Sequence, residues 1–266
     1  MLINDLSGFG RCSVAVQLPI ISQMGVQCCP LPTSILSNHT GFPSFYFDDY
    51  TKRMESYAIE WEKLGLEFRG ICTGFLGSHE QIGIVERLID RFRSEDTVVL
   101  VDPVMGDYGK KYSSYTDEMC ADLKRLCAHA DIITPNLTEA CILTGREYDE
   151  EAATDKYLEE TAAELAAMGP ESVVITGAPR GEILRNIVYR RGESPVMVNS
   201  KKIGESRSGT GDIFAAILAA DAVNGAKLGE SVRKAVRFIS ECIIKAVEMD
   251  IPLTDGVPFE EVMYKL

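Results

Sequence analysis

The run Thr97-Val98-Val99-Leu100-Val101 decides the fold class, and Asp102 follows it directly. Such an unbroken apolar run indicates a strand buried on both faces, as in a parallel sheet that helices cover on either side. An acidic residue directly after such a strand lies at the sheet edge where ligands bind in open α/β folds. The segments before and after this run test that prediction.

Short strands and amphipathic helices alternate along the rest of the chain. Strands are predicted at 1–3, 26–32, 69–73, 132–134 and 173–176, and helices at 12–24, 51–64, 78–92, 117–127, 137–143, 154–168, 213–222 and 231–248. The segments 183–189 and 196–203, joined around Gly192-Glu193, predict an antiparallel pair. This order predicts a mostly parallel sheet with helices on both faces, in one domain spanning residues 1–266.

Composition narrows the possible partners. The chain has 266 residues, 45% of them apolar, and a net charge of −13 from 27 basic and 40 acidic residues. Nucleic acid and anionic membranes need a positive footprint, so neither is an expected partner. The sequence shows no signal peptide, no CxxC spacing among its eight cysteines and no bilayer-spanning apolar run. A cytoplasmic protein with reduced thiols is expected.

A glycine-rich turn, Gly209-Thr210-Gly211-Asp212, precedes the apolar helix that begins at Ile213. Backbone N–H groups at such a helix start favour a phosphate. A carboxylate beside a phosphate is costly unless it has a task, and accepting a proton from an attacking hydroxyl is one such task. The alternative is an ordinary helix start with Asp212 in the first turn.

Two acidic turns follow neighbouring strands. Asp102-Pro103-Val104-Met105-Gly106-Asp107 places two carboxylates in a turn that suits Mg²⁺, although an ordinary acidic turn would look the same. In Thr134-Pro135-Asn136-Leu137-Thr138-Glu139, Asn136 and Glu139 share a helical face, and Asn136 is equally a candidate helix cap. Thr176-Gly177 follows the next strand. No P-loop and no GxGxxG after a strand is present.

These motifs, together with Ser37-Asn38-His39-Thr40-Gly41 and Gly74-Phe75-Leu76-Gly77-Ser78, occur in an order that resembles the pyridoxal (vitamin B6) kinases of the ribokinase-like superfamily. The resemblance covers nearly the whole chain. It implies a three-layer αβα sandwich, ATP as co-substrate, Mg²⁺ with a monovalent cation as a further candidate, and a homodimer.

The resemblance also implies roles for individual residues. Asp212 would be the base acting on the 5′-hydroxymethyl group of the vitamer, and Gly209, Thr210 and Gly211 would form the anion hole. Mg²⁺ would be held by Asp102, Asp107 and Glu139. ATP would be contacted by Thr134, Asn136, Thr176, Gly177 and Tyr112. The pyridine ring would be contacted by Asp5, Thr40 and Phe75.

The chain departs from the family pattern near its start. Asp5 stands where relatives commonly have serine, so either it pairs with the ring nitrogen or it caps the turn 4–10. The first strand, central in this family, is expected to be abbreviated to Met1–Ile3. A hydroxymethylpyrimidine kinase and a catalytically silent ligand-binding regulator are the alternative functions.

Overall fold

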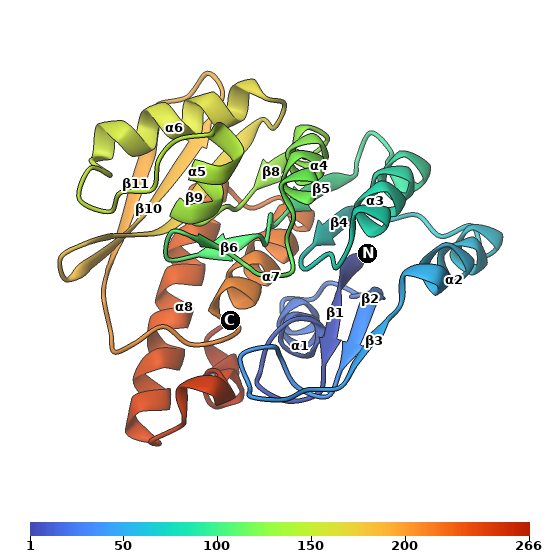
Figure 1. Cartoon of the computed structure of the whole chain (residues 1–266), viewed down its shortest axis with the longest axis horizontal. Helices are drawn as coiled ribbons and strands as arrows, with labels where there is room; N and C mark the ends of the chain where they lie inside the picture. The colour runs from blue at the N-terminus through green and yellow to red at the C-terminus, as the bar shows by residue number, and fades with distance from the viewer.

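The computed structural model describes residues 1–266 and contains a nine-stranded sheet with the order β11-β10-β9-β8-β5-β4-β1-β2-β3 (Figure 1). Its strands are β1 Leu2–Ser7, β2 Pro30–Leu36, β3 Phe47–Asp49, β4 Gly70–Thr73, β5 Val98–Val101, β8 Ile132–Ile133, β9 Ser172–Arg180, β10 Ile183–Arg190 and β11 Val196–Lys201. Across the sheet, the neighbouring strands β9, β8, β5, β4, β1 and β2 all pair in parallel. The antiparallel pair β10 and β11 closes one edge, as predicted, and β3 adds an antiparallel strand at the other.

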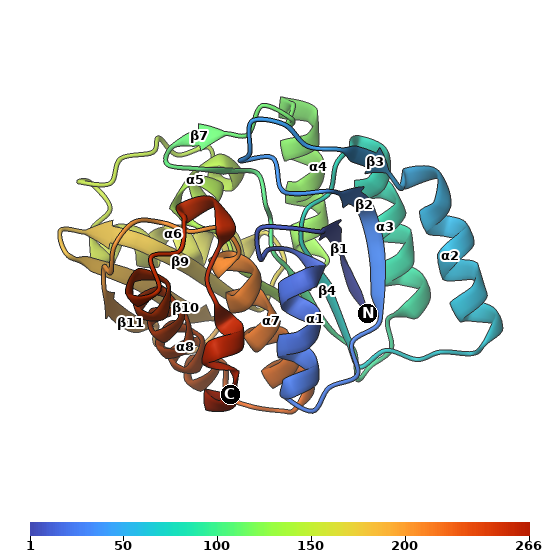
Figure 2. The ribbon, with the colours of Figure 1, turned by 90° about the horizontal axis from the view of Figure 1, so that it is seen from below.

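Helices cover both faces of this sheet, which confirms the three-layer sandwich. Beginning at the N-terminus they are α1 Val14–Gln23, α2 Thr51–Lys63, α3 His79–Phe92, α4 Asp117–Ala128, α5 Leu137–Thr144, α6 Asp155–Ala167, α7 Thr210–Val223 and α8 Leu228–Glu248. One core joins a face of the sheet to α2 through α6, and a second core joins the opposite face to α1, α7 and α8 (Figures 1 and 2). None of the helices has the length and hydropathy to cross a membrane.

The first strand is not abbreviated, so that prediction was wrong. β1 runs from Leu2 to Ser7 in the middle of the sheet, between β2 and β4. Its second half is polar in sequence, which had suggested a turn. The polar side chains are buried there because hydrogen bonds satisfy them, as the site below shows.

The second strand is shifted from its predicted place for the same reason. It was expected at 26–32, but β2 begins at Pro30 and ends at Leu36. The longer β1 extends the ladder, so that Ile35 and Leu36 pair with Leu6 and Ser7. Ser34, Ile35 and Leu36, which lay beyond the predicted strand, therefore belong to the sheet. A two-stranded hairpin of β6 Gly106–Asp107 and β7 Lys110–Lys111 also lies outside the predictions.

Candidate active site

The predicted catalytic carboxylate is held between two elements distant in sequence. Oδ2 of Asp212 accepts a hydrogen bond from the backbone N–H of Ser13 over 2.8 Å, and Oδ1 accepts one from Nδ2 of Asn4 over 3.2 Å. Burial, reinforced by the charge of Asp5, raises the pKa of Asp212 to about 7, against the two hydrogen bonds. A carboxylate with this pKa is a stronger base than an ordinary aspartate and remains partly ionised at neutral pH.

The turn between β1 and α1 that supplies the Ser13 N–H has unusual backbone geometry. Arg11 and Ser13 have positive φ angles of 47° and 57°. Such angles are unfavourable for residues other than glycine and persist only where the surroundings enforce them. Here the strain aims a backbone donor at Asp212, so the turn contributes to the site through its backbone alone.

The glycines of the predicted anion hole differ in their surroundings. Gly209 is the N-cap of α7 with φ of 82°, and a Cβ at this position would lie 1.9 Å from the carbonyl oxygen of Arg11. A Cβ at Gly211 would meet no atom within 4 Å. The N–H groups of Thr210, Gly211 and Asp212 open the helix and have no acceptor in the protein. Free donors that border open space suit an anion.

Asn4 is the residue that joins these parts. Its Nδ2 donates to Oε1 of Gln17 as well as to Asp212, and its Oδ1 accepts from the N–H groups of Asp5 and Phe75. Asn4 is 1% exposed, and these bonds occupy both of its amide hydrogens and its carbonyl oxygen. It therefore ties β1 to α1, α7 and the loop after β4. The sequence alone predicted no role for Asn4.

Glu139 and Asn136 form a reciprocal capping box at the start of α5. Oδ1 of Asn136 accepts from the N–H of Glu139, and Oε2 of Glu139 accepts from the N–H of Asn136. Oε1 of Glu139 also accepts from the N–H of Met105, and Nδ2 of Asn136 donates to the Gly106 carbonyl. The cap interpretation is confirmed, and the same pair shapes the acidic turn after β5.

The acidic side chains at this edge are close enough for their negative charges to repel one another. Burial first, and then the charge of Asp212, raise the pKa of Asp102, whose Oδ1 accepts a hydrogen bond from Thr134 over 3.1 Å. Burial and the charge of Asp102 likewise hold the pKa of Glu139 far above its ordinary value, and burial raises that of Asp107. Mutually repelling acids of this kind favour a bound cation.

The carboxylate oxygens at this edge are ligands that suit Mg²⁺, although they are not arranged as a complete coordination site. No group of three or more acidic, histidine or cysteine side chains has metal-ligating geometry. Oδ2 of Asp102 and Oδ2 of Asp107 have no hydrogen-bond partner in the protein, whereas both oxygens of Glu139 accept backbone N–H groups. The two aspartates are therefore the better candidates for direct contact, and Glu139 for an indirect one.

The predicted nucleotide-side residues lie along the same edge. Thr134 follows β8, and a backbone bridge joins Asn136 to Thr176 in β9. Gly177 has φ of 62° and open space at its Cα. Tyr112 follows the β6–β7 hairpin and is 44% exposed as a residue, and its partial burial together with the nearby carboxylates raises its pKa.

The predicted ring contacts lie on the other side of Asp212. Asp5 is buried in β1, its Oδ2 accepts a hydrogen bond from Ser7, and burial raises its pKa. Because β1 continues to Ser7, Asp5 does not cap a turn, and that alternative was wrong. Phe75 donates its N–H to Asn4 and packs edge-on against Tyr115 at 6.2 Å. Thr40 is exposed on the loop between β2 and β3, next to His39.

The chain is similar in sequence to kinases that act on small molecules. A family model described as phosphomethylpyrimidine kinase matches residues 21–253. The chain is 29% identical to the pyridoxine/pyridoxal/pyridoxamine kinase of Bordetella avium over 88% of its own length and 81% of the relative's. It is 30% identical to the pyridoxine kinase of Bacillus subtilis, over 77% of this chain and 73% of that one.

A solved structure covers almost the whole chain. It is a putative phosphomethylpyrimidine kinase from Bacteroides thetaiotaomicron, in a crystal form with pyridoxal, with a TM-score of 0.95 and 37% identity. The superposition covers 99% of this chain and 93% of that structure. The chain therefore belongs to the phosphomethylpyrimidine kinase family, among the relatives of the vitamin B6 kinases of the ribokinase-like superfamily.

Proposed function

We propose that the protein transfers the γ-phosphoryl group of ATP to the 5′-hydroxymethyl group of a B6 vitamer: pyridoxal, pyridoxine or pyridoxamine. One observation carries the proposal. Asp212, with a pKa of about 7, sits beside the unoccupied N–H donors that open α7. A base next to an anion site is what phosphoryl transfer to an alcohol requires.

Each part of the site has a task in this reaction. Asp212 accepts the proton of the vitamer hydroxyl, while Ser13 and Asn4 fix the direction in which its carboxylate points. The N–H groups of Thr210 and Gly211 hold the oxygens of the phosphoryl group in transfer. Because this chemistry needs positioning and charge neutralisation above all, a rigid turn and free donors supply much of what it demands.

The nucleotide would lie along the strand ends after β8 and β9. Thr134, Asn136, Thr176 and Gly177 would line its phosphates, and Tyr112 would close over it from the β6–β7 side. Asp102 and Asp107 would hold Mg²⁺ with Glu139 behind them, and Mg²⁺ when bound would neutralise charge on the phosphates. A monovalent cation remains a further candidate, and the homodimer remains a prediction.

A hydroxymethylpyrimidine kinase is the second candidate, because the family model that matches is described by a phosphorylated pyrimidine substrate. The curated relatives described above are named for B6 vitamers, and the Bacteroides structure was crystallised with pyridoxal. Those names favour the B6 assignment. A silent regulator is disfavoured because it would have no use for Asp212 beside the anion site.

A substrate panel tests the proposal. The purified protein is assayed with Mg-ATP against pyridoxal, pyridoxine, pyridoxamine and hydroxymethylpyrimidine, and the phosphorylated products are identified by mass. We expect kcat/KM to be highest for a B6 vitamer. A higher kcat/KM for hydroxymethylpyrimidine would transfer the assignment to the second candidate. Binding of pyridoxal without any turnover would favour the regulator.

A further inference from the structure

The segment Ile251–Gly256, which follows α8, touches loops from both sides of the site. After α8 the chain turns back and runs beside it (Figure 2). Backbone carbonyls of this segment accept hydrogen bonds from three side chains: Arg11, His39 and Arg207. These come from the β1–α1 turn, the β2–β3 loop and the loop before α7. We call the segment the brace.

His39 attaches the β2–β3 loop to the brace. Its Nε2 lies 2.7 Å from the carbonyl oxygen of Thr254, and its Nδ1 lies 3.1 Å from the N–H of Gly41. A carbonyl can only accept and an N–H can only donate, so the ring is the neutral tautomer with its proton on Nε2. Both ring nitrogens are therefore engaged, one with the brace and one within the loop that carries Thr40.

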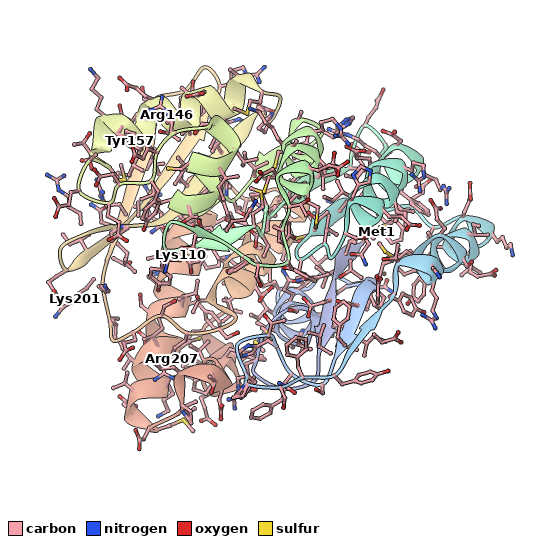
Figure 3. The ribbon with its side chains drawn as sticks, in the orientation of Figure 1. Met1, Lys110, Arg146, Tyr157, Lys201 and Arg207 are labelled. Atoms are coloured by element: carbon pink, nitrogen blue, oxygen red, sulfur yellow. The ribbon has the colours of Figure 1, made fainter.

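Arg207 attaches the anion-hole loop to the same segment. Its Nη1 donates to the carbonyls of Ile251 and Pro252 over 2.7 and 3.2 Å, and its own carbonyl accepts from Thr210. Figure 3 shows Arg207 beside α8. Its Nε is buried without a partner, and the hydrogen bonds of its guanidinium go to backbone carbonyls.

The β1–α1 turn is packed between the brace and the anion-hole loop. Gly256, with φ of 76°, approaches so closely that a Cβ there would lie 2.6 Å from the Gly10 carbonyl oxygen. A Cβ at Gly209 would likewise overlap the Arg11 carbonyl oxygen. Nη1 of Arg11 donates to the Asp255 carbonyl over 3.2 Å. Gly256 and Gly209 thus both pack closely against the strained turn that aims Ser13 at Asp212.

We propose that the brace 251–256 sets the position of the β2–β3 loop, which carries Thr40 on the vitamer side, relative to the anion hole. His39 and Arg207 are its positioning residues. The inference rests on the proposed function, which assigns the vitamer to one side of Asp212 and the phosphates to the other. A change on either side then alters binding on the opposite side through the shared segment. Neither residue has to touch the ligand that its substitution weakens.

Binding of each ligand alone tests this coupling. His39→Phe keeps an aromatic ring against Phe42, whose ring centroid lies 4.7 Å from that of His39, and removes both hydrogen bonds. Arg207→Met removes the donors on the opposite side. The dissociation constants for pyridoxal without nucleotide, and for Mg-AMPPNP without pyridoxal, are measured by calorimetry for the parent chain and both variants. AMPPNP is a non-hydrolysable ATP analogue that keeps the γ-phosphoryl group for the anion hole.

The brace predicts crossed effects. His39→Phe should weaken Mg-AMPPNP binding, and Arg207→Met should weaken pyridoxal binding, each by about three- to tenfold, the size of one lost hydrogen bond. His39→Gln, which keeps a donor for the Thr254 carbonyl, should recover most of the Mg-AMPPNP affinity. For each ligand, the double variant should lose less affinity than the product of the two single-variant losses, because either substitution alone already frees the brace.

Arg191→Met is the matched control. Arg191 also donates to backbone carbonyls. Its acceptors are those of Ala166, Gly169 and Pro170, which are not residues assigned to the site. It should leave both dissociation constants within about twofold of the parent's, the effect of a surface substitution. If His39→Phe or Arg207→Met does not fold, His39→Gln and Arg207→Lys replace them with smaller crossed effects expected.

The outcomes separate the brace from the proposed function. Losses confined to the side of each substitution, with no crossed effect, would overturn the brace and leave the kinase assignment intact. Equal losses in Arg191→Met would reduce the effect to general destabilisation and would also overturn it. A parent chain that binds neither pyridoxal nor Mg-AMPPNP would instead refute the proposed function.

Discussion

The backbone N–H of Ser13 donates a hydrogen bond of 2.8 Å to Oδ2 of Asp212, which lies 199 positions away in the sequence. Ser13 makes this contact with a positive φ of 57°, in a turn against which Gly209 and Gly256 pack closely. The orientation of the proposed base thus depends on backbone packing at positions that carry no reactive side chain. The first prediction tests this dependence.

Gly209→Ala and Gly211→Ala should fail for different reasons. At Gly209 the methyl group would overlap the Arg11 carbonyl oxygen, and the φ of 82° is unfavourable for alanine. We expect a loss of stability of about 2–4 kcal/mol, from backbone strain and overpacking together. At Gly211 there is open space, so stability should hold while the methyl group enters the proposed phosphate position and lowers kcat/KM at least about tenfold.

Thermal melts and steady-state assays of both variants check this contrast. Gly25→Ala is a useful control, because Gly25 also has a positive φ, 78°, but its Cα faces open space away from the site. It should show the backbone strain alone and near-parental kinetics. A fully active Gly211→Ala protein would contradict the anion-hole assignment.

The raised pKa of Asp212 predicts how stability depends on pH. Its folded value of about 7 exceeds the unfolded value of about 3.9, so the folded state keeps a proton that the unfolded state loses. Stability therefore falls as pH rises from about 4 to about 7, with a penalty on the order of 1–2 kcal/mol after allowance for solvent contact. Asp212→Asn should remove this penalty.

The Tm difference between Asp212→Asn and the parent should accordingly be about 2–6 °C more favourable to the variant at pH 8 than near pH 4. The amide keeps only one acceptor for the N–H donors of Ser13 and Asn4, a cost that lowers the variant's Tm at both pH values. The surface substitution Asp90→Asn serves as a control and should change the Tm at neither pH. A Tm difference that is the same at both pH values would show that ionisation of Asp212 does not contribute.

Glu139→Gln should act on the nucleotide side. Both carboxylate oxygens of Glu139 accept backbone N–H groups, so an amide leaves one of those donors without an acceptor. We expect KM for Mg-ATP to rise several-fold, with a loss of stability of about 1–3 kcal/mol. Titration with pyridoxal in the absence of nucleotide should give the parental affinity, and an equal loss there would contradict the assignment.

Asp5→Ser should change the pH dependence of vitamer binding. If the carboxylate faces the ring nitrogen, it favours the pyridinium form by charge pairing, so the substitution should weaken binding of the protonated ring more than of the neutral one. A pH series of pyridoxine titrations measures this. Burial already raises the pKa of Asp5, and it accepts a hydrogen bond from Ser7. Identical pH profiles for parent and variant would refute the pairing.

Sequence predicted the layers of the fold well, because periodicity survives wherever strands are apolar throughout. The buried run before Asp102 and the antiparallel pair near Gly192 are both confirmed. The first strand could not be predicted this way. Asn4 is buried in β1 because it bonds with Gln17, Phe75 and Asp212, which come from distant elements, whereas Asp5 and Ser7 hydrogen-bond to each other.

The candidate site was predictable where side chains carry the chemistry. Asp212 and the carboxylates after β5 and β8 can be identified from the sequence by their residue type and position. The Ser13 N–H has no such signal, because any non-proline residue supplies a backbone donor. The contacts of His39 and Arg207 are to backbone carbonyls of the brace, and nothing in the residues at 251–256 indicates that role.

The most direct test of the central claim is kcat for Asp212→Asn. The amide keeps the shape of the side chain and removes a negative charge from beside the phosphates, so the fold and the affinity for Mg-ATP should be retained. It also removes the group that accepts the hydroxyl proton, so kcat with pyridoxal should fall by about 10²–10⁴ while the KM values change little. A folded Asp212→Asn protein that phosphorylates pyridoxal at near-parental kcat would contradict the account.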